Sequence, residues 1–302
     1  MNGFWYKLLA HAARLCGAWL FAMVARIIAV GFFLFSRRVP VSRRFYAALY
    51  PGRGRLYHLW CTFQQYQNFT TIHFDRFLSR HNKAVNFTTA GWEKLDGMVG
   101  RQGAILLMSH LGNWEIAASL LKKLRADTPL LLYMGVKEKE GLERLQKEDL
   151  RQAGVTIIGA DQQNSSPFSA VEGIRFLQAG GFISMAGDMV WRADQRKIRV
   201  RFLGHDAYLP EAPFVFALVS GAPLMVFFAF RTGRNSYHFT LSEPITLSSK
   251  SRRDRAEVIG LAAQQYAALL EKSLRLHPFE WYHFDRFIED HVHASEDHPG
   301  PE

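Results

Sequence analysis

The residues best suited to chemistry lie in a short segment, residues 109–115 with the sequence SHLGNWE, which follows a strongly apolar run. A histidine imidazole has an ordinary pKa of roughly 6.5 and can take a proton from a substrate hydroxyl. A carboxylate bound to one ring nitrogen fixes the tautomer of the histidine and stabilises the imidazolium that forms. His110 and Glu115 are therefore candidates for a general base and its orienting partner.

The His-x4-Glu spacing is weak by itself, because the chain contains it three times, as His110/Glu115, His238/Glu243 and His291/Glu296. The second pair lies in a strand-like run, where an odd spacing sends the two side chains to opposite faces. The third pair lies in a polar tail. Only the first stands where a buried strand ends and a helix begins, with Gly112 at the turn, and ligands of open α/β sheets bind at this edge. A buried histidine satisfied by hydrogen bonds is the alternative.

Other catalytic motifs are missing from the sequence. It has no Gly-x-Ser-x-Gly elbow, no His-Glu-x-x-His zinc motif, no P-loop and no Gly-x-Gly-x-x-Gly loop. A His–carboxylate pair without a nucleophile of its own suits direct activation of a substrate hydroxyl. Cys16 and Cys61 form no CxxC pair, so we expect neither a disulfide framework nor a metal site.

The pattern from about residue 86 onward alternates short apolar runs with helical stretches. We expect strands at residues 104–108, 130–133, 155–158, 182–186 and 224–230, and helices at residues 113–124, 140–151, 169–178, 213–219 and 255–276. This alternation predicts an α/β fold with a mostly parallel central sheet covered by helices. An aromatic stripe at residues 57–78 predicts a further amphipathic helix.

An apolar stretch near the N-terminus, residues 15–36, is interrupted by a single charge, Arg26. It is long enough for a spanning helix of about 20 residues. The arginine makes spanning only marginally favourable, so a membrane-spanning anchor and in-plane binding both stay open. A long buried helix of the globular domain is the third reading.

The formal net charge of +10 indicates a polyanionic partner. Arginines are dense in residues 37–55, directly after the apolar stretch, which favours an anionic membrane surface over nucleic acid. If the stretch spans, this excess places the main domain in the cytoplasm. We expect three parts: a membrane anchor helix at residues 1–40, a catalytic domain at residues 41–290, and a disordered tail at residues 291–302.

The SHLGNWE segment closely resembles the signature of the lipid A late acyltransferase family, within the lysophospholipid and glycerolipid acyltransferase superfamily. Further landmarks follow in the family's order: AGD at residues 186–188, FLG at 202–204, FVFALVSGAP at 214–223 and PFEWYHF at 278–284. Arg144 or Arg151 resembles the family's arginine. Residues 187–189 and 211–212 depart from the usual pattern and match a less studied branch of predicted acyltransferases.

The resemblance implies an acyltransferase at the cytoplasmic side of the bacterial inner membrane. Such an enzyme moves a fatty acyl chain from an acyl-carrier protein or acyl-CoA onto a hydroxyl or amine of a membrane lipid, without metal or cofactor. The departures leave the acceptor open among lipid A, another glycolipid, an aminolipid and a polyene lipid head group. A thioester hydrolase and a non-catalytic lipid-binding membrane protein are the alternatives on this fold.

Other candidate substrate-binding residues each have a structural alternative. Asn113 and nearby backbone amides could bind the acceptor or an oxyanion, or Asn113 could cap the helix. Asp188, at a strand end, could hold Arg151 or shape the cleft, or be a turn residue. A basic run could meet the donor's phosphate or an acidic carrier, or form a solvated strand face; it comprises Arg192, Arg196, Arg199 and Arg201.

Overall fold

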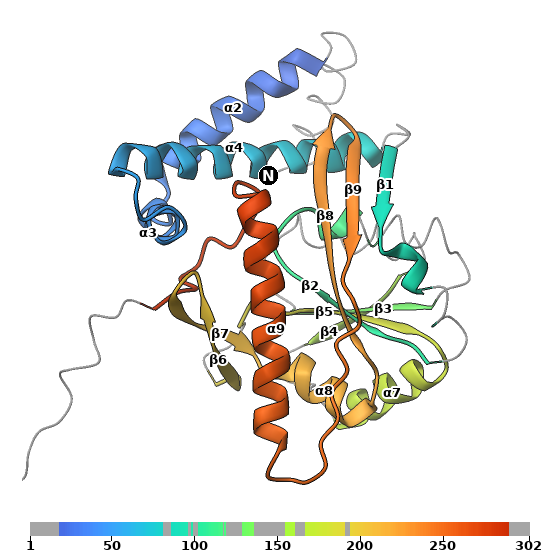
Figure 1. Cartoon of the computed structure of the whole chain (residues 1–302). Helices are drawn as coiled ribbons and strands as arrows, with labels where there is room; N and C mark the ends of the chain where they lie inside the picture. Colours follow the sequence, from blue (N-terminus) through green and yellow to red (C-terminus); the bar gives the residue numbers. More distant parts are fainter. Residues whose placement is uncertain are drawn as a thin grey trace, which may run out of the picture.

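A computed structural model describes residues 18–80, 86–95, 98, 102–116, 118, 129–135, 155–160, 167–190 and 194–289. Its central sheet has seven strands in the order β1-β9-β8-β2-β5-β3-β4 (Figure 1). The strands are β1 (Asn86–Ala90), β2 (Ile105–Met108), β3 (Leu130–Gly135), β4 (Thr156–Ala160), β5 (Phe182–Ala186), β8 (Leu224–Gly233) and β9 (Ser236–Leu241). Neighbouring strands pair in parallel, except β8 with β9. The predicted α/β fold with a mostly parallel sheet is confirmed.

The helices that accompany the sheet follow the predicted pattern where the structure describes them. They are α7 (Pro167–Gln178), α8 (Ala212–Ser220) and α9 (Arg255–Leu276). α7 packs against β5, and α8 packs against β2 and α9. A separate antiparallel hairpin of β6 (Lys197–Phe202) and β7 (His205–Pro210) packs against α9. The helix expected at residues 140–151, and most of that at 113–124, lie outside the described residues.

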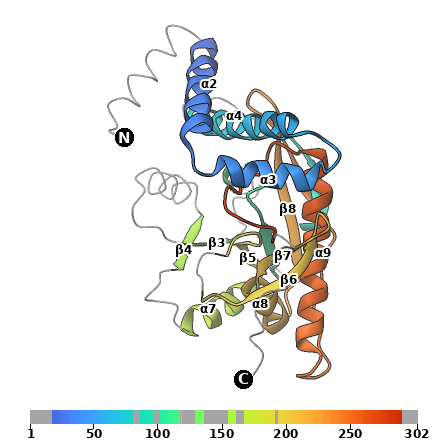
Figure 2. The same cartoon turned by 90° about the vertical axis from the view of Figure 1, so that its left-hand side faces the viewer.

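Three further helices form a layer at one end of the molecule: α2 (Ala18–Phe35), α3 (Val39–Leu49) and α4 (Arg55–Arg80) (Figures 1 and 2). We call this the helical layer. α4 corresponds to the aromatic stripe, whereas α3 was not predicted. Its arginines indicated a charged membrane-facing segment, yet Phe45, Tyr46 and Leu49 are buried on its other face. The segment is therefore an amphipathic helix.

A membrane-spanning helix is not found in the described part of the chain: none of its helices combines sufficient length with sufficient apolar character. The N-terminal anchor is thus unconfirmed and stays a prediction, as do the three part boundaries. Residues 1–17 and the tail from residue 290 lie outside the described residues.

The strand pairing at the centre of the sheet sets up the site. All four residues of β2 are buried, and β2 lies between β5 and β8. Met108 at the end of β2 pairs with Ala186 at the end of β5. Residues two positions beyond these ends therefore emerge at the same level, on the carboxyl edge of two adjacent parallel strands.

Candidate active site

His110 and Asp188 are the two residues that emerge together at this edge. The carboxylate Oδ1 of Asp188 lies 2.9 Å from Nδ1 of His110. Its Oδ2 accepts a second hydrogen bond, from the backbone N–H of His110, at 2.7 Å. A carboxylate at Nδ1 favours the tautomer with the proton on that nitrogen, which leaves the lone pair of the neutral ring on Nε2. The imidazole is therefore arranged to act as a base.

The Asp188 carboxylate is almost fully buried, with 1% of the residue exposed. Burial by itself raises the pKa of this group, but the charge and hydrogen bond of His110, the charge that His283 carries only at acidic pH, and a hydrogen bond from Trp281 lower it to about 2. Asp188 is therefore ionised at neutral pH. A buried carboxylate in this state can stabilise an imidazolium on its neighbour.

A segment after the last helix completes the surroundings of Asp188. We call residues 277–289 the closing segment. The indole Nε1–H of Trp281 donates to Asp188 Oδ2 at 2.9 Å, and Trp281 is buried. The ring of His283 lies edge-on to that of His110, with centroids 6.0 Å apart. Asp188 thus accepts three hydrogen bonds, two from His110 and one from the closing segment.

The turn after His110 depends on a glycine. Gly112 has φ of +81°, and a Cβ there would collide with the backbone carbonyl of Ala229. The N–H of Gly112 donates to the Glu280 carbonyl at 2.9 Å, and the N–H of Asn113 donates to the Ala229 carbonyl at 2.7 Å. β8 and the closing segment therefore both fix this turn, as the predicted tight geometry requires.

Glu115 lies in the helical turn that follows, at residues 114–116, and is half-buried. It was predicted to orient His110. The carboxylate found at Nδ1 of His110 is that of Asp188, which lies 78 positions after His110 in the chain. The role of Glu115 as the partner of His110 stays a prediction.

Asn113 caps the helical turn that follows it, which was the structural alternative to a substrate-binding role. Its Oδ1 accepts a hydrogen bond from the N–H of Ile116 at 3.4 Å, three residues later, as an N-cap side chain does. Its amide nitrogen lies 3.4 Å from the hydroxyl of Tyr237, and the residue is buried. A direct contact of Asn113 with substrate stays a prediction.

The predicted arginines separate into two groups. Arg199 and Arg201 lie on exposed positions of β6 and form ion pairs with Asp206 of β7, at 2.6 and 2.9 Å. They stabilise the hairpin, and contact with a donor stays a prediction. Arg144 and Arg151 lie outside the described residues, as does Arg192, so the proposed pairing of Asp188 with Arg151 is not described.

The second copy of the His-x4-Glu spacing has separate partners. His238 Nδ1 lies 2.7 Å from the hydroxyl of Thr88, whereas Glu243 forms an ion pair with Lys94 at 2.6 Å. His238 and Glu243 are therefore matched control positions for His110 and Glu115. The third copy, at residues 291 and 296, lies outside the described residues.

Sequence reasoning did not assign functional roles to Trp281 and His283. The available signal was the Trp-x-His pattern in an aromatic stretch after the last helix. No periodicity places this irregular segment against β2, so only the fold brings it to Asp188. Within the described residues, no group of three His, Cys, Asp or Glu side chains could hold a metal ion.

A His–carboxylate pair at the carboxyl edge of a largely parallel sheet defines an α/β protein with a candidate base-catalytic centre. The family of bacterial lipid A biosynthesis acyltransferases matches residues 68–287, more than two thirds of the chain. The chain therefore belongs to this family, and membership supports acyl transfer onto a lipid. No curated protein matches the chain closely enough to be named as a relative.

Proposed function

We propose that the protein transfers a fatty acyl chain from an acyl-carrier protein or acyl-CoA thioester to a hydroxyl or amine of a membrane lipid. Family membership supports the reaction class. The single observation that carries the assignment to a site is the pairing of His110 with buried Asp188 at the edge of the sheet. His110 is proposed as the general base, and Glu115 as a further carboxylate that stabilises its charged form.

The proposed reaction is a direct displacement at the thioester. Nε2 of His110 takes the proton of the acceptor hydroxyl or amine as the oxygen or nitrogen attacks the thioester carbonyl carbon. Asp188 stabilises the imidazolium through Nδ1. The carbon–sulfur bond then breaks, and the imidazolium returns its proton to the leaving thiolate. The products are the acylated lipid and the free thiol, so one proton passes from acceptor to sulfur.

The test is an assay with labelled palmitoyl-CoA or palmitoyl-acyl-carrier protein, a total lipid extract of a Gram-negative bacterium, and the purified protein in detergent. We expect a labelled lipid, and His110→Ala should lower its rate by about 10³-fold, as loss of a general base does. His238→Ala, the matched control, should keep the wild-type rate. Free fatty acid without labelled lipid would indicate a thioester hydrolase, and no turnover would favour a non-catalytic lipid-binding role.

We also propose that α2 binds an anionic membrane surface at the cytoplasmic side of the inner membrane. Several large apolar side chains of α2 are exposed, and Phe35 is the most exposed at 86%. Two arginines, Arg37 and Arg38, follow the helix directly. An apolar helix face beside cationic residues suits the interface of a membrane with anionic lipids.

Sedimentation with phosphatidylglycerol vesicles tests this surface. We expect the double variant Phe32→Asp/Phe35→Asp to remain largely unbound, while Leu261→Asp, at an exposed apolar position of α9, binds like the wild type. Equal binding of all three proteins would contradict a role for α2.

A further inference from the structure

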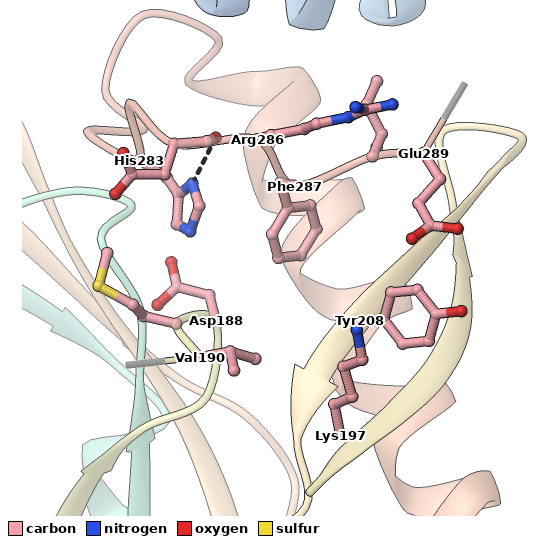
Figure 3. Close-up of a pocket in the computed structure, with 11 residues that line it drawn as sticks. Asp188, Val190, Lys197, Tyr208, His283, Arg286, Phe287 and Glu289 are labelled. Atoms are coloured by element: carbon pink, nitrogen blue, oxygen red, sulfur yellow. Dashed lines mark hydrogen bonds between the residues drawn. The ribbon is translucent and has the colours of Figure 1, made fainter. Parts of the chain in front are cut away.

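A cavity of about 470 Å³ lies beside the catalytic pair, between the β6–β7 hairpin and the closing segment (Figure 3). Asp188 and His283 line one end of it, and Lys197 and Tyr208 of the hairpin line the other. Its volume falls in the range of small-molecule sites. The reaction proposed above assigns no role to this space or to His283.

His283 presents a defined nitrogen to its surroundings. Its Nδ1 lies 3.1 Å from the backbone carbonyl of Asp285. A carbonyl oxygen only accepts hydrogen bonds, so Nδ1 carries the proton and Nε2 holds the lone pair of the neutral ring. Figure 3 shows the second ring nitrogen directed toward Asp188, away from this carbonyl. The Asp285 contact therefore fixes Nε2 as a hydrogen-bond acceptor.

Two features keep the His283 ring neutral, with its proton on Nδ1. Its ring packs against those of Trp281 and Phe287, with both centroids 5.3 Å away. Burial lowers the pKa of His283 below its ordinary value. This decrease is larger than the increase in pKa that the nearby Asp188 carboxylate causes. The ring is therefore neutral at physiological pH, and a neutral Nε2 acceptor is satisfied by an O–H or N–H donor.

The charges around the cavity indicate what kind of molecule fits. The lining contains both signs: the cations Lys197 and Arg286, and the anions Asp188, Asp285 and Glu289. Lys197 also lies over the ring of Tyr208, 4.3 Å from its centroid. A lining with more acids than bases disfavours a multiply charged phosphate group, such as those of an acyl-CoA. It suits a neutral or zwitterionic group rich in hydroxyls or amines.

We infer that this cavity binds the polar head group of the acyl acceptor, with Nε2 of His283 accepting a hydrogen bond from one of its hydroxyl or amine groups. The inference rests on the proposed acyl transfer. It restricts the acceptor to a lipid whose head group carries a hydroxyl or amine donor in addition to the group that is acylated. Asp188, the partner of His110, lines the cavity, so a head group bound there would lie beside the proposed catalytic pair.

Steady-state kinetics with palmitoyl-CoA and the total lipid extract test the inference. His283→Phe keeps an aromatic ring against Trp281 and Phe287 but removes both nitrogens. It should raise the apparent KM for the extract about tenfold, the upper range for a neutral hydrogen bond, and leave the KM for palmitoyl-CoA unchanged. His283→Gln, whose side-chain oxygen can accept a hydrogen bond, should recover part of this loss. A merely structural role would not separate the two KM values.

A second variant tests the cavity without altering His283. Val190→Trp narrows the same space and should also raise the apparent KM for the extract while sparing that for palmitoyl-CoA. Unchanged acceptor KM values in the folded variants, or a rise in the palmitoyl-CoA KM instead, would overturn the inference. Absence of transfer by the wild-type protein is a different result, because it overturns the proposed function itself.

Discussion

Two segments of different origin meet at the proposed base. Residues 109–115 follow β2 directly, and their geometry is set by a strand end and the turn at Gly112. The closing segment follows about 170 residues later in the chain and is joined to the first segment by backbone hydrogen bonds. Tyr282 N–H donates to the His110 carbonyl at 2.8 Å, and Gly112 N–H donates to the Glu280 carbonyl at 2.9 Å. The local motif at residues 109–115 thus contains the proposed base, and residues distant in the sequence orient it.

The closing segment is in turn held by the helical layer. Gln65 of α4 donates a hydrogen bond to the Trp281 carbonyl at 2.5 Å, and the hydroxyl of Tyr46 in α3 donates to the Pro278 carbonyl at 2.9 Å. The ring of Phe45 packs edge-on against Trp281, with centroids 4.9 Å apart. The layer proposed to meet the membrane therefore also supports the residues that orient the base.

The largest effect is expected from Asp188→Asn. An asparagine amide can donate to Nδ1 of His110, which would move the imidazole proton to Nε2 and abolish the base. We expect kcat for acyl transfer to fall by roughly 10²–10⁴-fold, the usual contribution of general base catalysis, and the equivalent change in a serine-protease triad lies at the upper end, about 10⁴-fold. Asp254→Asn, a surface change at the start of α9, should leave kcat unaltered. A decrease below tenfold would show that Asp188 does not control the tautomer.

The same carboxylate should affect stability as a function of pH. Its pKa in the folded state is about 2, against an ordinary value of 3.8. Its contribution is therefore present above pH 4 and is lost as the pH falls through 2, with a size of about 2 kcal/mol. Urea unfolding of wild type and Asp188→Asn should show a stability gap that narrows by this amount between pH 5 and pH 2. A gap independent of pH would contradict the assignment.

A smaller effect is expected from Glu115→Gln, which tests the other carboxylate of the motif. We expect kcat to fall about thirtyfold, because loss of a unit charge about 8 Å from an imidazolium costs about 2 kcal/mol at an effective dielectric constant near 20. Glu243→Gln, in the second copy of the spacing, should have no effect. A larger loss than that of Asp188→Asn would make Glu115 the principal partner of His110.

The smallest effect on the reaction is expected from Trp281→Phe, which keeps an aromatic ring but removes the hydrogen bond to Asp188. A hydrogen bond to a charged group contributes about 1.5 kcal/mol at the low end, so kcat should decrease about tenfold. Trp92→Phe, in the short helical turn after β1, serves as the control. An unaltered pH–rate profile and kcat for Trp281→Phe would confine Trp281 to a structural role.

The parts of the molecule that sequence could predict are those governed by local pattern. The strand at residues 182–186 and the helix at residues 255–276 have the predicted bounds, because their periodicity is long or their apolar run is continuous. His110 was found through the strand–Gly–helix setting. The contact with Asp188 was not, because it depends on β5 lying next to β2, an order that no local pattern encodes.

The most direct test of the central claim is the protonation of His110 itself. In ¹⁵N-histidine NMR of the detergent-solubilised protein, assigned with the His110→Ala variant, we predict a protonated Nδ1 and an unprotonated Nε2 at neutral pH. The proton should move to Nε2 in Asp188→Asn. A wild-type protein with the proton already on Nε2 would contradict the account, because that nitrogen could not then accept a proton from a lipid.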